Sequence, residues 1–144
     1  MKRLFLVLAF VTGAFVLGGS GAYAQGTHMF AVLVGGNETP AAGDPDGFGS
    51  ASVTFRGEDL TQVCVAIFVT GIGPATMAHI HRGFGDVAGP IVVTLTTPGA
   101  NGFGVGCRTV SPELSRQIRA NRYGFYINVH TAAFPGGAVR GQLF

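Results

Sequence analysis

The segment Ser50–Arg56 reads Ser-Ala-Ser-Val-Thr-Phe-Arg, so that Ala51, Val53 and Phe55 alternate with polar residues. Side chains of a β-strand point to opposite faces in turn, and this alternation is therefore typical of a strand with one buried face. The next run, Val63–Thr70, is apolar at nearly every position. It predicts a neighbouring strand that is buried on both faces.

Short β-prone runs of the same kind recur along the chain, separated by Gly, Pro, Asn and Asp. The further expected strands are Phe30–Val34, Met77–His81, Ile91–Leu95, Gly104–Val110, Phe125–His130 and Ala138–Phe144. One helix is expected between Ser111, a good N-cap followed by proline, and Gly124. About eight strands with one short crossover helix predict an all-β fold, either a Greek-key β-sandwich or a flattened barrel.

The first 24 residues have the pattern of a secretory signal peptide. Lys2 and Arg3 precede the apolar run Leu4–Leu17, and Ala22-Tyr23-Ala24 supplies small residues for cleavage after Ala24. The apolar run is shorter than the roughly 20 residues that span a bilayer. We therefore expect a secreted or periplasmic protein with one domain, residues 25–144, and no membrane span after cleavage.

The charge of the chain argues against a nucleic-acid partner. The sequence has nine Lys and Arg residues against seven Asp and Glu. Cleavage would remove Lys2 and Arg3 and leave a nearly neutral domain. Its arginines are scattered along the sequence, whereas nucleic-acid binding requires a clustered basic surface.

The chain has two cysteines, Cys64 and Cys107. In an exported protein two cysteines most simply form a disulfide. Closing a loop of this length would stabilise the fold by roughly 4 kcal/mol in the chain-entropy model. A metal-binding or catalytic thiol is the alternative.

Three of the four histidines are candidates for a metal site. His79 and His81 are two residues apart in an expected strand, so their imidazoles project from the same face about 7 Å apart. His130 ends another expected strand, on the face that also carries Tyr126 and Asn128. If the two strands are neighbours, three imidazoles can bind one ion at a partly exposed site, and imidazole suits copper and zinc.

Other interpretations of these residues remain open. The three histidines can be structural, each bonded to a loop carbonyl. His28 precedes the first expected strand and is expected to lie in a mobile segment, outside the site. Arg82 and Arg140 can be solvated or paired surface residues, or one of them can lie beside a metal or an anion.

Several blocks of the sequence resemble the CHRD domain, which is named for chordin. They include Ala-His-Ile-His-Arg-Gly at 78–83, Gly-Pro-Ile-Val-Val at 89–93, Tyr-Ile-Asn-Val-His-Thr-Ala at 126–132 and Pro-Gly-Gly-Ala-Val-Arg-Gly-Gln-Leu at 135–143. The resemblance extends from about Phe30 to Phe144. It implies an immunoglobulin-like or superoxide-dismutase-like β-sandwich. In chordin such repeats belong to an extracellular antagonist of growth-factor signalling.

The likeness to superoxide dismutases extends to the histidines. Copper–zinc dismutases also carry a His-x-His strand and a later Val-His, and this analogy would make His79, His81 and His130 copper ligands. The chain has no histidine between His81 and His130 to bridge a zinc ion, so a binuclear site is not expected.

The sequence thus favours an exported binding module whose partner is a metal ion, copper or zinc, or an extracellular protein. The alternatives are a mononuclear copper redox enzyme of dismutase type and a purely structural extracellular interaction domain.

Overall fold

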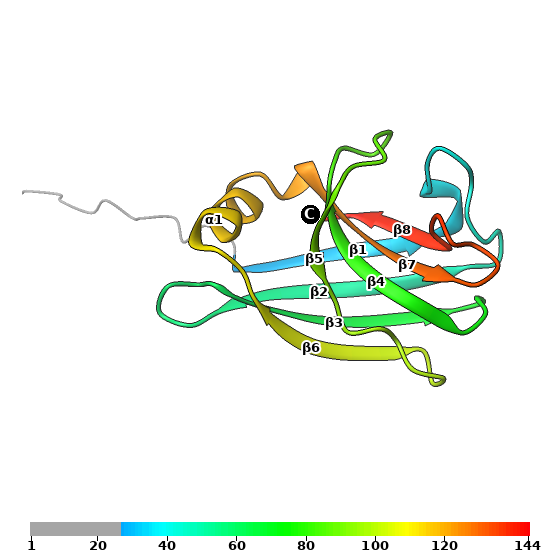
Figure 1. Ribbon diagram of the computed structural model, residues 1–144, viewed down its shortest axis with the longest axis horizontal. Helices are drawn as coiled ribbons and strands as arrows, with labels where there is room; N and C mark the ends of the chain where they lie inside the picture. The colour runs from blue at the N-terminus through cyan, green and yellow to red at the C-terminus, as the bar shows by residue number, and fades with distance from the viewer. Residues whose placement is uncertain (1–26) are drawn as a thin grey trace, which may run out of the picture.

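A computed structural model describes residues 27–144, and within them the chain forms eight β-strands and one α-helix (Figure 1). The strands are β1 (His28–Val34), β2 (Phe48–Arg56), β3 (Gln62–Thr70), β4 (Ala75–Arg82), β5 (Ile91–Thr94), β6 (Phe103–Thr109), β7 (Phe125–Thr131) and β8 (Val139–Gln142). The helix is α1 (Pro112–Ala120), and two 3-10 turns are η1 (Gly35–Asn37) and η2 (Arg122–Gly124). The predicted all-β fold with one short helix is confirmed. The predicted signal peptide lies outside the described residues.

All eight strands belong to one antiparallel sheet with the order β5-β4-β7-β8-β1-β2-β3-β6. β1, β2 and β3 are neighbours in sequence order and form a meander. β4 lies near the other end of the sheet, beside the edge strand β5, and β6 is the edge strand next to β3. The predicted crossover helix is confirmed, because α1 lies in the connection from β6 to the distant β7. The sheet curls into a nearly closed barrel, and this topology brings β4 and β7 side by side.

The interior of the barrel is filled by alternate residues of the strands. Val53 and Phe55 of β2 are buried as the alternation predicts. The prediction that β3 is buried on both faces is wrong: Ile67 and Val69 point inward, but Ala66 is exposed. Within residues 27–144 no second layer covers the outer face of β3, so the apolar residues of that face are at least partly exposed. Each large side chain buried inside contributes about 1.5–3 kcal/mol.

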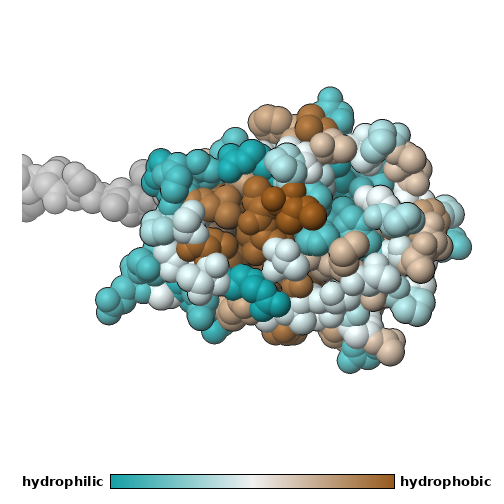
Figure 2. All heavy atoms as spheres, viewed as in Figure 1, coloured by the Kyte–Doolittle hydropathy of each residue, from teal (hydrophilic) through white to brown (hydrophobic). Residues whose placement is uncertain are grey.

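The edge strands β5 and β6 are not paired by backbone hydrogen bonds, and the seam where these two edges approach each other is filled by side chains. Val92, Val110 and Leu114 are partly buried and pack against the core there. They line a shallow cleft that both edges and the start of α1 share. Figure 2 shows apolar side chains gathered on the surface between α1 and β5.

The helix begins where the sequence predicts. The Ser111 hydroxyl accepts a hydrogen bond from the Leu114 amide at 3.1 Å, which caps the first turn. Ser115 is fully buried and donates to the Leu60 carbonyl at 2.5 Å, so it ties the helix to the turn before β3. No helix of residues 27–144 has the length and apolar character that a bilayer span requires.

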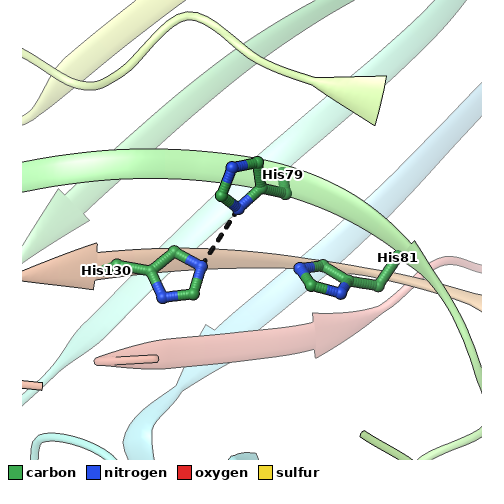
Figure 3. Close-up of side chains that lie close together, drawn as sticks. All are labelled: His79, His81 and His130. Carbon is green, nitrogen blue, oxygen red and sulfur yellow. Dashed lines mark hydrogen bonds between the residues drawn. The ribbon is translucent and has the colours of Figure 1, made fainter. Parts of the chain in front are cut away.

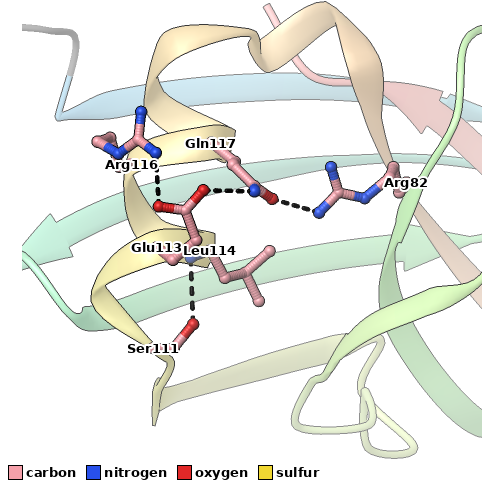
Figure 4. A network of polar contacts seen from close by, with 6 residues as sticks. All are labelled: Arg82, Ser111, Glu113, Leu114, Arg116 and Gln117. Atoms are coloured by element: carbon pink, nitrogen blue, oxygen red, sulfur yellow. Dashed lines mark hydrogen bonds and ion pairs between the residues drawn. The ribbon is translucent and has the colours of Figure 1, made fainter.

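Arg82 at the end of β4 holds the other side of the helix. Its guanidinium donates to the Gln117 side chain, and Gln117 in turn donates to Glu113 (Figure 4). The guanidinium carbon also lies 5.0 Å from the centre of the Phe125 ring. Arg82 is therefore an exposed arginine paired with α1, which agrees with the interpretation of Arg82 as a paired surface residue.

The predicted disulfide between Cys64 and Cys107 is confirmed. The two residues lie directly opposite each other on β3 and β6, 43 residues apart in sequence. The bond fastens the edge strand β6 to its neighbour β3.

Candidate metal centre

The three histidines singled out in the sequence meet on one face of the β4–β7 pair (Figure 3). In the register of this pair His79 lies opposite Asn128, and His81 lies opposite Tyr126. His130 is two residues from Asn128, so it projects from the same face, diagonally across from His79. The expectation that the two strands are neighbours with these side chains on a common face is confirmed.

The spacing of the imidazole nitrogens suits a common metal ion. His79 Nδ1 lies 3.1 Å from His130 Nε2, and one nitrogen from each of the three residues falls within 4.8 Å of the others. Two nitrogens bound tetrahedrally at 2.0–2.1 Å are about 3.3 Å apart. The His79–His130 pair already has this separation, and the His81 ring needs to approach by about 1.5 Å.

Backbone carbonyls orient two of the imidazoles. His81 Nδ1 donates to the Gly89 carbonyl at 2.8 Å, and His130 Nδ1 donates to the Pro135 carbonyl at 3.0 Å. Each bond leaves the Nε2 lone pair of that ring free to accept. His81 Nε2 is buried and has no hydrogen-bond partner among residues 27–144, whereas His130 Nε2 faces His79. Carbonyl bonds of this kind fix the tautomer and direction of metal-binding histidines in proteins.

His79 completes the group through its Nδ1 atom. With no metal bound, His79 Nδ1–H is the donor to His130 Nε2, because His130 Nδ1 already carries the proton given to Pro135. Metal binding would move the His79 proton to its Nε2 and put the ion in place of the hydrogen bond.

The site is buried, and the expectation of a partly exposed site is wrong. His79, His81 and His130 are 4%, 8% and 6% exposed. The cause is a layer of loops that the sequence pattern does not reveal: the β4–β5 loop contributes Gly89, and the β7–β8 loop contributes Pro135. These loops cover the face of the sheet that lies away from the barrel core.

Tyr126 and Arg140 form a stack beside His81. The rings of His81 and Tyr126 are parallel within 8°, with centres 4.8 Å apart, and the Arg140 guanidinium carbon is 3.4 Å from the Tyr126 centre. Since β7 lies between β4 and β8, His81 and Arg140 flank Tyr126 from opposite sides. Arg140 is almost completely buried and donates to two loop carbonyls, so the interpretation of Arg140 as a solvated surface residue is wrong.

His28 lies away from the three-histidine group. It is the first residue of β1, exposed, with its Nδ1 atom 3.3 Å from the Thr54 hydroxyl. The expectation that it precedes the first strand in a mobile segment is wrong, because β1 begins two residues earlier than its apolar pattern indicates. Its exclusion from the site agrees with the expectation.

Burial changes the acid–base properties of the group. Burial, together with charge repulsion from His130 and His81, lowers the pKa of His79 to about 4. Burial also lowers the pKa of His130, although the bond to Pro135 acts in the opposite direction. Both imidazoles are therefore neutral at pH 7, which is the form that binds metals.

These pKa values predict an acid-sensitive metal-free protein. Unfolded His79 binds a proton near pH 6.5, whereas folded His79 does so only near pH 4. The unfolded state therefore takes up more protons between these values, and the free energy of unfolding falls as the pH is lowered through this window. The full loss attributable to His79 is about 3 kcal/mol.

Urea unfolding with a chelator at pH 7.5 and pH 4.5 measures this loss. His79→Asn, which keeps a donor toward His130, should lose clearly less stability over the same interval. Equal pH dependence in both proteins would show that His79 is not held neutral by the fold.

Sequence reasoning missed the partners of the histidines. Gly89 and Pro135 act through backbone carbonyls, which leave no signal in side-chain chemistry. The alternation did place Tyr126 and Asn128 on the face of His130, but it assigned neither of them a role beside the histidines.

Comparison with known proteins identifies the family. The search of curated proteins found no match. A profile of the CHRD domain matches residues 29–143, which include all of the barrel except the first residue of β1, together with the disulfide and the three histidines. The match covers far more than half of the chain and agrees with the resemblance seen in the sequence blocks. The chain therefore belongs to the CHRD domain family.

Proposed function

We propose that this protein is an exported binding module that holds one copper or zinc ion through His79, His81 and His130. The observation that carries the proposal is the buried His81 Nε2, which has no hydrogen-bond partner and lies beside the His79–His130 pair. A buried acceptor without a partner costs about 1–3 kcal/mol. A metal ion bonded to all three nitrogens removes this cost.

The burial of the site supports binding rather than catalysis. Catalytic metal sites keep a coordination position open to water or substrate, whereas structural sites are closed. The three ligands are covered by the β4–β5 and β7–β8 loops. A redox enzyme of dismutase type would require these loops to admit a substrate.

Export is supported by two features at a distance from the site. The first 24 residues have the signal-peptide pattern, and the Cys64–Cys107 disulfide persists in an oxidising compartment. We infer a secreted or periplasmic location, with residues 25–144 as the mature domain.

Calorimetric titration of the metal-free mature protein tests the proposal. We expect one site per chain for both zinc and copper(II), with dissociation constants below about 1 µM. Copper(II) should bind more tightly than zinc, in keeping with the general affinity order of divalent ions.

Binding weaker than about 1 mM for both ions would refute the proposal and leave the purely structural interaction domain. A superoxide assay on the copper-loaded protein separates a binding module, which should be inactive, from a dismutase.

A further inference from the structure

Asn128 lies at the centre of the three histidines. It is directly opposite His79 across the β4–β7 pair, and His81 is the diagonal neighbour on the same strand. His130 is two residues away on β7 and so points from the same face. Asn128 therefore projects from the strand face that carries the three histidines, between positions that bear an imidazole.

The two polar atoms of this amide have different surroundings. The amide group is hydrogen-bonded to the Glu38 carboxyl, for which the Nδ2 atom is the donor. The Oδ1 atom is buried and has no hydrogen-bond partner. Asn128 is 2% exposed, so water does not reach this oxygen from the surface.

Asn128 Oδ1 and His81 Nε2 are thus two buried acceptors without a partner, on residues that are diagonal neighbours across the β4–β7 pair. Buried acceptors are nearly always paired with a donor or a cation. No donor of a described residue pairs with either atom. A cation between them would satisfy both, together with His79 and His130.

We propose that Asn128 Oδ1 is the fourth ligand of the metal ion, so that the site is a closed set of three nitrogens and one oxygen. This inference rests on the proposed function and names the ligand that completes the site. A closed set of four protein ligands is the arrangement of structural zinc sites.

Glu38 acts as the positioning residue for this ligand. Its carboxyl accepts from the Asn128 Nδ2 atom and thereby leaves Oδ1 as the amide atom that is free to bind a cation. Glu38 is itself buried and is packed against Gly137, where a Cβ atom would lie 2.2 Å from Glu38 Oε1. Glycine at 137 thus leaves the space that the carboxyl occupies.

Cobalt(II) is a suitable probe because its visible absorption reports the number and kind of its ligands, and azide reports an open position. The wild-type protein loaded with cobalt(II) should show a four-coordinate spectrum that azide does not change. In Asn128→Leu the affinity should fall about 10–100-fold, and azide should now change the spectrum because the fourth position is vacant.

Asn128→Asp keeps the oxygen and adds a negative charge. This conservative variant still tests the fourth ligand if Asn128→Leu does not fold. It should bind cobalt(II) at least as tightly as the wild type, with a shifted spectrum that remains insensitive to azide. His28→Ala is the control, because His28 is exposed at the start of β1 and lies outside the three-histidine group. It should leave the cobalt(II) affinity and the azide response of the wild type unchanged.

An azide-sensitive wild-type spectrum would overturn the inference. So would Asn128→Leu and Asn128→Asp proteins whose affinity and spectrum match those of the wild type, while leaving the three-histidine site intact. Absence of cobalt(II) and zinc binding by the wild type itself would instead refute both the inference and the proposed function.

Discussion

Replacing His79 with alanine is expected to reduce the affinity for zinc and copper(II) by at least about 100-fold. Loss of a residue that merely orients a ligand typically costs 10–100-fold, so loss of a ligand should cost no less. His79 is central to the group because its Nδ1 atom faces His130 at 3.1 Å and its ring lies edge-on to that of His81. His130→Ala should have a similar effect. Calorimetric titration of the metal-free variants measures both.

The control is His28→Ala, which removes an exposed histidine at the start of β1. It should bind both metals as the wild type does. Near-ultraviolet circular dichroism and an intact disulfide would show that the His79 variant is folded, since the barrel core lies on the other face of the sheet. Undiminished binding by folded His79→Ala would place the ion elsewhere.

Removal of the disulfide is expected to lower the free energy of unfolding by about 4 kcal/mol. The bond closes a loop of 43 residues and therefore restricts the unfolded chain. It also ties β6, an edge strand, to β3. Because β6 leads directly into α1, we expect the seam between β5 and β6 to loosen in the reduced protein.

Urea unfolding of the oxidised wild type and of the Cys64→Ala/Cys107→Ala double variant measures this difference. The reduced wild type should unfold at the same urea concentration as the double variant. A difference below about 1 kcal/mol would show that the unfolded chain is not restricted as the entropy model requires.

The sequence predicted the elements that depend on local pattern. The alternation in β2 and the Ser-Pro start of α1 are local signals, and both structures occur where expected. The two-residue spacing of His79 and His81 likewise fixes their common face. The prediction that β3 is buried on both faces was wrong for a physical reason. An apolar run does not reveal whether other elements of the fold cover its outer face.

The rest of the site depends on long-range pairing. His130 joins the other histidines only because β7 returns to lie beside β4 after the β5, β6 and α1 segments. The loops that bury the site act through the carbonyls of Gly89 and Pro135. Neither the register of distant strands nor the path of a loop can be obtained from residue alternation.

Anomalous diffraction from crystals of the zinc-loaded protein, measured at the zinc absorption edge, tests the metal site most directly. We predict one peak about 2.0–2.1 Å from His79 Nδ1, His81 Nε2 and His130 Nε2. The contradicting result is a crystal of protein that bound zinc in solution but shows no anomalous peak at this position, with His79 still hydrogen-bonded to His130. These histidines would then not be the metal ligands.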